Sequence, residues 1–280
     1  MNKNKLVSIV IPTRNSSDVL ENCLRSVKSQ VYPNVEIIIA DGKSSDNVLE
    51  IARKYNCRFY LFSPKIKEVF FDAPHKINFG VSKANGEYIY WLDADMEVTK
   101  NLIKEAVEVC EKKGAGAVII PEESFGEGIW AKAKQLERRC YWGDDTVESP
   151  RFFIKKVWDE VGGFDLKLGA GANDWDLHLK VKEHGYKVMR TKSLVLHNEG
   201  KLTLTKLFKK RYMYGREVVK YIEKRPKASF TSFFPIRKAY IKNWRMFVKS
   251  PIVSIAFIIM RTAEYTGGFL GILANTIHKK

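Results

Sequence analysis

Glycine is missing from the place where a dinucleotide-binding domain of the dehydrogenase type needs it. The first apolar run ends in Pro12-Thr13-Arg14-Asn15, with no G-x-G-x-x-G behind it. That motif cradles a pyrophosphate on backbone amides, so its absence argues against such a domain. The glycine-rich stretches at residues 114–116 and 169–171 stand elsewhere in the sequence, and no P-loop pattern occurs. If the chain binds a nucleotide, another group must hold the phosphates.

Cysteine is scarce, and no two cysteines form a Cys-x-x-Cys pair. Scattered single cysteines of this kind favour reduced thiols in a cytoplasmic protein. The N-terminal segment contains only a short apolar run that leads straight into an expected strand, so we expect no signal peptide. The four cysteines are Cys23, Cys57, Cys110 and Cys140.

Acidic residues are nearly absent from residues 201–250, which hold 15 Lys and Arg against 2 Asp and Glu, a net charge of +13. The whole chain carries +16, and residues 1–200 contribute only +1 of it. A strongly basic segment predicts a polyanionic partner, either a membrane or a nucleic acid.

The chain also lacks the uninterrupted apolar run of about 20 residues that a membrane-spanning helix needs. Residues 252–260 are apolar, but Arg261, Glu264 and the pair Gly267-Gly268 follow. This pattern predicts an interfacial or re-entrant helix pair whose basic side chains reach lipid headgroups. A helical cap would explain the aromatic residues of this segment but not its charge. Nucleic-acid binding would explain the charge but not the apolar run.

Strand and helix patterns alternate through the first half of the chain. Apolar runs at residues 7–11, 35–40, 58–62 and 88–92 are separated by segments with helical periodicity. This alternation predicts parallel strands joined by right-handed crossovers, which is a doubly wound α/β sheet. We expect one domain over residues 1–200 and a basic, helical, membrane-associating region over residues 201–280.

Two carboxylates, Asp93 and Asp95, follow the buried run at residues 88–92. Ligands of a doubly wound sheet bind at the carboxyl ends of its strands, where residues 12–15 and Asp41 are also expected. Two carboxylates one residue apart make a hard oxygen site that suits Mg²⁺ or Mn²⁺, and such a cation can hold a diphosphate. An isolated Asp-x-Asp is commonly an ordinary turn, so the rest of the chain decides.

Five segments, in order, resemble the family-2 glycosyltransferases with the GT-A fold. VSIVIPTRN, EIIIADGKSSDN and NGEYIYWLDADM are similar to the first part of that family. GGFDLKLGAGANDWDLHLKVKEHGYKV is similar to its segment with a carboxylate base, and LVLHNEG to its later His motif. The resemblance implies a nucleotide-diphospho-sugar transferase with its GT-A catalytic domain in residues 1–200.

The resemblance also implies which residues bind the nucleotide sugar. Pro12, Thr13 and Arg14 line the nucleotide pocket, and Asp41 contacts the base or ribose. Lys76 and Asn78 lie near the nucleotide or phosphate. Many family members have Asp-Asp where this chain has Asp41-Gly42. The family pattern therefore supports the contact between Asp41 and the base less strongly.

The reactive residues follow from the same resemblance. Asp93 and Asp95 form the Asp-x-Asp pair, with Asp93 also contacting the nucleotide sugar and Asp95 the more direct metal ligand. Asp174 is the general base, although the usual preceding Glu is Asn173 here. His197 approaches the metal or the diphosphate. Without the resemblance, Asp174 reads as a first-turn helix acid and His197 as a structural histidine. Asp176 and His178 flank the base and are interpreted as helix-face residues.

The predicted function is an inverting, metal-dependent glycosyltransferase with Mn²⁺ or Mg²⁺ as cofactor. It moves a hexose from a UDP- or GDP-linked sugar to a lipid-linked saccharide or another membrane-associated acceptor hydroxyl. The cation stabilises charge on the leaving diphosphate, and the acceptor hydroxyl needs a base. The absence of Gln-x-x-Arg-Trp argues against polymer synthesis. We expect the protein at the cytoplasmic face of the cell membrane, with no nucleic-acid partner.

Two alternatives remain open at this point. A polyprenyl- or dolichyl-phosphate sugar synthase has an acceptor that is already anionic, so it would not need Asp174 as a base. A basic nucleic-acid-binding protein would instead show salt-sensitive binding and no sugar transfer.

Overall fold

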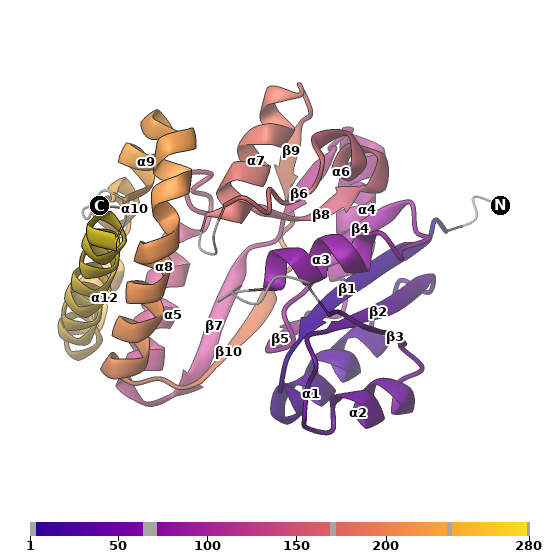
Figure 1. The fold of residues 1–280 in the computed structure, drawn as a ribbon, viewed down its shortest axis with the longest axis horizontal. Helices are drawn as coiled ribbons and strands as arrows, with labels where there is room; N and C mark the ends of the chain where they lie inside the picture. The colour runs from indigo at the N-terminus through magenta and orange to yellow at the C-terminus, as the bar shows by residue number, and fades with distance from the viewer. Residues whose placement is uncertain (1–3, 64–71, 169–171, 234–236, 279–280) are drawn as a thin grey trace. The chain divides into compact units, whose positions relative to one another are not determined.

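The structure is a computed structural model that describes residues 4–63, 72–168, 172–233 and 237–278 (Figure 1). The chain forms two units, each built from separate stretches. The first consists of residues 1–121, 149–166 and 177–196, and the second of residues 122–148, 167–176 and 197–280. The expected domain division at residue 200 stays a prediction.

The first unit contains a seven-stranded sheet with the order β3-β2-β1-β4-β8-β6-β9. β1 pairs in parallel with β2 and β4, β2 with β3, and β6 with β9. The predicted α/β fold is therefore confirmed. The strands are β1 (Val7–Thr13), β2 (Val35–Asp41), β3 (Arg58–Leu61), β4 (Tyr88–Trp91), β6 (Ala117–Ile119), β8 (Pro150–Ile154) and β9 (Val188–Arg190).

One strand departs from the expected parallel order, since β8 runs antiparallel to both of its neighbours, β4 and β6. The chain leaves this unit after Pro121 and re-enters it at Ser149. For β8 to run parallel to β6, the connection between them would have to bring the chain back to the edge of the sheet where β6 begins. No such crossover helix lies between β6 and β8 among the described residues of the first unit.

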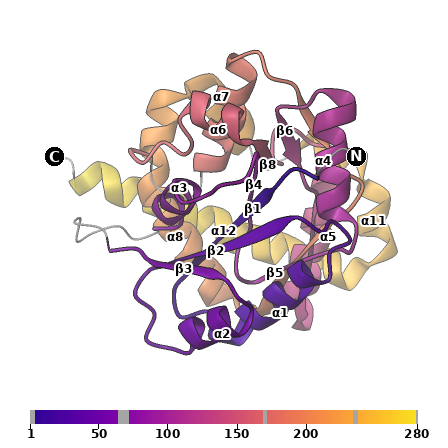
Figure 2. The ribbon, with the colours of Figure 1, turned by 90° about the vertical axis from the view of Figure 1, so that its right-hand side faces the viewer.

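Helices lie on both faces of the sheet (Figure 2). Ile9 and Ile11 of β1 pack into the core with α1 (Ser17–Lys28), α2 (Val48–Lys54) and α4 (Leu102–Lys113). Val10 packs on the opposite face with α3 (Ala73–Val81) and α6 (Lys155–Val161). Because helices cover both faces, apolar residues predominate along strands such as β1, β2 and β4, and this is why the sequence identified them. The short strand β5 (Met96–Val98) follows β4.

The second unit is mainly helical. Its core is formed by α5 (Gly128–Tyr141), α8 (Leu204–Lys224) and α12 (Pro251–His278), with apolar side chains such as Leu136, Leu207 and Met260 packed together. The strands β7 (Glu122–Glu127) and β10 (Val195–Lys201) are neighbours in a second sheet; β7 belongs to this unit, and β10 enters it at His197. The remaining helices are α7 (Asn173–Glu183), which begins in this unit, α9 (Pro226–Phe233), α10 (Lys238–Lys242) and α11 (Trp244–Lys249).

The expected helix pair near the C-terminus is wrong, because α12 is one helix of 28 residues. Gly267 and Gly271 do not break it but allow it to approach α8. A Cβ on Gly271 would lie 2.0 Å from the carbonyl oxygen of Tyr212, and one on Gly267 would lie 2.6 Å from that of Phe208. The glycines are therefore contact points between two helices. Within the described residues, no helix is both long and apolar enough to cross a bilayer.

Candidate functional site

Three of the predicted nucleotide-binding residues form one buried polar cluster in the first unit. Thr13 and Asp41 end β1 and β2 in register, and the Thr13 hydroxyl donates to Asp41 Oδ1 over 2.9 Å. Lys76 of α3 donates to the Thr13 carbonyl oxygen over 3.0 Å and pairs with Asp72 at 2.8 Å. Thr13, Asp41 and Lys76 are each at most 4% exposed. The sheet thus presents fixed polar groups at its carboxyl edge, where ligands of such folds bind.

Gly42 is explained by this cluster. A Cβ at Gly42 would lie 2.9 Å from Asp72 Oδ2, 3.3 Å from Lys76 Nζ and 3.4 Å from the Thr13 carbonyl oxygen. A second aspartate at this position, as in the Asp-Asp of many family members, would displace the Lys76–Asp72 pair. A side chain at position 42 would therefore require the Asp72 or Lys76 side chain to shift.

The other residues predicted near the nucleotide have different environments. Pro12 is buried and Arg14 is exposed. Asn78 uses its side-chain amide to hold the turn after α6, because its Nδ2 donates to the Phe164 carbonyl oxygen over 2.9 Å and its Oδ1 accepts from the Phe164 amide over 3.0 Å. The nucleotide contacts of these three residues stay predictions.

The Asp-x-Asp pair follows β4, as expected, and one of its members is ion-paired. Arg151, near the start of β8, donates to Asp93 Oδ2 over 3.0 Å, and its guanidinium lies 4.0 Å from the centre of the Trp91 ring. Arg151 was not predicted, because it stands 58 residues away and belongs to no motif. The pair places a fixed positive group beside Asp93. Asp95, two residues further along the chain, is half-buried.

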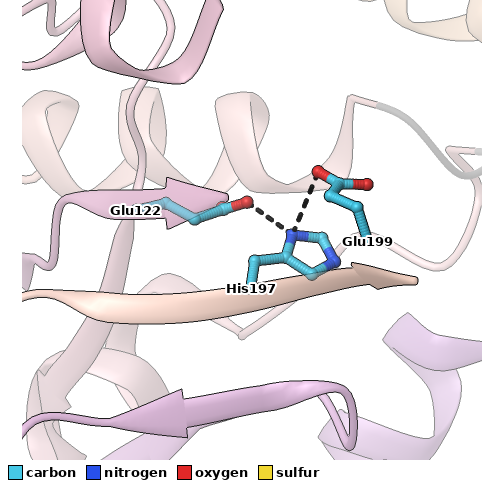
Figure 3. Close-up of side chains that lie close together, drawn as sticks. All are labelled: Glu122, His197 and Glu199. Carbon is cyan, nitrogen blue, oxygen red and sulfur yellow. Dashed lines mark hydrogen bonds and ion pairs between the residues drawn. The ribbon is translucent and has the colours of Figure 1, made fainter. Parts of the chain in front are cut away.

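The second unit holds His197 between two carboxylates (Figure 3). His197 Nδ1 lies 2.6 Å from Glu122 Oε1 and 3.8 Å from Glu199 Oε1. One ligand atom from each of the three residues lies within 4.8 Å of the others, so they form a group that can hold a metal ion. Glu122 comes from β7, while His197 and Glu199 are two residues apart on β10 and share a face of that strand. Neither glutamate was predicted from the sequence.

Both glutamates of this group have a further partner. Arg138 of α5 pairs with Glu122 at 3.0 Å, and the Ser124 hydroxyl donates to Glu199 over 2.8 Å. Burial alone would lower the pKa of Arg138, but the Glu122 and Glu199 carboxylates raise it above the usual value. A cation at His197 would share Glu122 with Arg138, which weakens the site for a metal.

Asp174 lies at the start of α7, and the structure shows what holds that helix end. Asp176, two residues on, is fully buried and pairs with Lys224 at 2.9 Å and Arg225 at 3.0 Å, at the end of α8. Burial, together with the charges of Asp174 and Asp176, raises the pKa of Tyr221 to about 12. The helix start therefore carries two carboxylates, one of them neutralised by basic partners.

Asp176 and His178, interpreted as helix-face residues, are both buried on α7, with exposed fractions of 0% and 4%. The charged partners of Asp176 stand 48 and 49 residues later, so local periodicity could not reveal them. The glycine-rich loop before Asp174, residues 169–171, lies outside the described residues.

Comparison with known proteins gives consistent findings. Residues 8–166 match the family model described as "Glycosyl transferase family 2". The chain is 33% identical over 115 residues to "Glycosyltransferase GlyG" of Streptococcus pneumoniae, which covers 41% of this chain and 38% of that protein. It is 28% identical over 188 residues to a "PGL/p-HBAD biosynthesis glycosyltransferase" of Mycobacterium bovis, covering 62% and 69% of the two chains.

A solved structure extends the likeness to the whole chain. The mannosyltransferase PcManGT from Pyrobaculum calidifontis, solved with GDP-Man and Mn²⁺, superimposes with a TM-score of 0.68. The match covers 100% of this chain and 89% of the other, at 14% sequence identity. At that identity the likeness concerns the fold, and it confirms a GT-A-like architecture.

Proposed function

Because the chain belongs to glycosyl transferase family 2, we propose that it moves a hexose from a UDP- or GDP-linked sugar to the hydroxyl of a lipid-linked saccharide or another membrane-associated acceptor. The observation that carries the proposal is the carboxyl edge of the first unit's sheet. There, Thr13, Asp41 and Lys76 form one polar cluster, and the Asp93–Arg151 pair follows the adjacent strand β4. The cytoplasmic face of the membrane is the proposed location.

Asp95 and Asp93 are the proposed ligands of Mn²⁺ or Mg²⁺. The donor set fits such an ion, because two half-buried carboxylates one residue apart offer hard oxygen atoms. When bound, the ion neutralises charge that develops on the leaving diphosphate. Arg151 already balances Asp93, so Asp95 is the more direct ligand, and Arg151 adds a second positive group for the phosphates.

His197 is proposed to contact the metal or the diphosphate. Its Nδ1 faces Glu122, so a neutral ring that donates there has its acceptor lone pair on Nε2. Glu122 therefore acts as the positioning residue for His197. On the same face, the Ser124 hydroxyl of β7 donates to Glu199 of β10.

Asp174 is proposed as the general base that takes the proton from the acceptor hydroxyl. Direct attack by that hydroxyl on the anomeric carbon, with departure of the nucleotide diphosphate from the opposite face, inverts the configuration. The buried Asp176 ion pairs fix the start of α7 and with it the backbone that carries Asp174.

The metal assignment is tested by donor binding. Thermal-shift measurements with UDP, GDP and their sugars should show stabilisation that requires Mn²⁺ and disappears in EDTA. Asp95→Ala should remove the Mn²⁺-dependent part, whereas Asp159→Ala, at an exposed aspartate of α6, should leave it intact. Nucleotide-sugar binding that is equal with and without metal in both variants would contradict the assignment.

The base assignment is tested separately, by turnover. Asp174→Asn should lower turnover about 10²–10⁴-fold with little change in donor affinity, because a lost general base costs that much. Unchanged turnover would remove Asp174 from the mechanism and favour the polyprenyl-phosphate acceptor, which needs no base.

A further inference from the structure

The outward face of α12 is apolar along most of the helix. Its exposed large side chains recur at helical spacing, and several are more than half exposed, including Ile252 at 74%, Ile255 at 60% and Phe269 at 60%. From residue 252 to residue 273 this face extends about 32 Å at 1.5 Å per residue. Its members are Ile252, Ile255, Ile258, Ile259, Phe269, Leu270 and Leu273.

The charged residues of α12 turn away from this face. Arg261 and Glu264 are the charged residues among the described side chains of α12, and their side chains are 11% and 3% exposed. Both pair with residues of the core, Arg261 with Glu137 at 2.8 Å and Glu264 with Lys134 at 2.9 Å. The exposed face therefore carries apolar residues and the exposed Thr262 and Thr266, without a charge.

Basic residues stand directly before this face. The short helices α10 and α11 expose Ile241, Trp244 and Val248, which are 64%, 56% and 66% exposed. Next to each of them in the sequence is an exposed basic residue, Lys242, Arg245 and Lys249, and residues 237–250 contain no Asp or Glu. An indole with adjacent basic side chains is typical of the boundary between water and lipid headgroups.

We propose that α10, α11 and α12 form a surface that lies flat on an anionic lipid bilayer, with the apolar face of α12 among the acyl chains and the basic residues of α10 and α11 at the headgroups. Two observations select lipid as the occupant. The apolar face is long and uncharged, as an interfacial helix requires. Its basic margin, free of acidic residues, complements anionic headgroups and would repel its own counterpart on a second copy.

The inference deepens the proposed function, since it names the surface through which the enzyme would reach a membrane-bound acceptor. Its test measures binding to vesicles and not sugar transfer. The membrane-binding surface can therefore be refuted without refuting the proposed transferase activity, and the reverse is also true. The full chain is floated with vesicles of phosphatidylcholine alone or mixed with phosphatidylglycerol. We expect flotation with the mixed vesicles at low salt, and reduced but persistent flotation at high salt, since salt screens only the charge interaction.

Two variants separate the apolar and basic contributions. Ile252→Glu/Ile259→Glu should lower partitioning about tenfold or more, because each isoleucine loses its burial in lipid. Lys242→Gln/Arg245→Gln/Lys249→Gln should lose the preference for anionic vesicles and keep the salt-resistant part. The control Leu49→Glu/Leu61→Glu makes the same change at exposed apolar residues of the first unit and should float like the parent.

Three results would overturn the proposal. The parent chain stays at the bottom of the gradient with anionic vesicles at low salt. The Leu49→Glu/Leu61→Glu control loses as much binding as the α12 variant. In the third, neither the parent nor Ile252→Glu/Ile259→Glu floats, and sedimentation without vesicles shows a dimeric parent and a monomeric variant. That result would assign the apolar face to contact with a second copy of the chain. If Ile252→Glu/Ile259→Glu does not fold, flotation of Lys242→Gln/Arg245→Gln/Lys249→Gln still tests the proposal.

Discussion

The buried charges that join α12 to α5 predict a large loss of stability for a substitution that changes almost no volume. Glu264 accepts from Lys134 at 2.9 Å and Arg261 at 2.5 Å, and lies 3.4 Å from Arg211. Glu137 pairs with Lys134 at 2.7 Å and Arg261 at 2.8 Å. The five groups carry three positive and two negative charges, so Glu264→Gln raises the net charge of this buried cluster from +1 to +2.

Breaking a buried ion pair by removing one partner costs about 3–5 kcal/mol, because the other charge stays buried without compensation. For a chain of this size that loss corresponds to a decrease of roughly 6–20 °C in melting temperature. Circular dichroism during thermal unfolding measures it. The matched control is Glu108→Gln in the exposed Glu108–Lys112 pair, where surface pairs contribute at most about 1 kcal/mol.

The same cluster predicts how stability depends on pH. Burial would raise the pKa of Glu137, but the charges of Arg261 and Lys134 outweigh it and lower this pKa to about 2. Burial likewise opposes the lowered pKa of Glu264, which Lys134, Arg211 and Arg261 hold well below its usual value. A depressed folded-state pKa stabilises the protein above the unfolded value of about 4.3. This stability should disappear as pH falls from about 4.3 towards 2. Glu264→Gln should flatten that profile. A melting temperature within 2 °C of the parent, or no change in the acid limb, would refute the reasoning.

Two further predictions concern helix contacts. Gly271→Ala should destabilise the second unit by about 1–3 kcal/mol in thermal melts, because its Cβ would lie 2.0 Å from the Tyr212 carbonyl oxygen. The control Gly268→Ala should be neutral or stabilising, since its Cβ would meet only the Arg211 carbonyl oxygen, at 3.9 Å. Equal effects of the two substitutions would show that α8 and α12 do not approach so closely. Asp176→Asn should lower turnover while leaving the donor dissociation constant unchanged, because it releases Lys224 and Arg225 from the start of α7; a loss confined to donor affinity would contradict that role.

The fold of the first unit was predictable because its information is local. Strands covered on both faces are predominantly apolar, so residues 7–11, 35–40 and 88–92 stood out without any tertiary knowledge. β7 did not stand out, because its sequence EESFGE contains charged and glycine residues whose partners lie elsewhere in the chain. The antiparallel direction of β8 has no local signal, since it depends on the route of the chain before it.

The candidate site divides in the same way. Asp93, Asp95, Asp41 and Thr13 follow recognisable strands, so their place at a sheet edge could be predicted from pattern. Arg151 and Glu122 could not, because each becomes relevant only through a partner more than 50 residues away, Asp93 for one and His197 for the other. Such residues have no motif of their own, and only the folded geometry identifies them.

The C-terminal helix shows why a count of charges along a window can mislead. Arg261 and Glu264 lower the mean hydropathy of α12 below what a membrane-spanning helix needs. Together with Gly267-Gly268, they also suggested that the helix is interrupted there. In the structure all four serve the inner side of one continuous helix, two as ion-pair partners of α5 and two beside the backbone of α8. A mean hydropathy does not separate the two faces of α12, of which the inner one carries the charges and the outer one carries none. That reversal of the usual soluble pattern is expected of a helix whose outer side meets lipid rather than water.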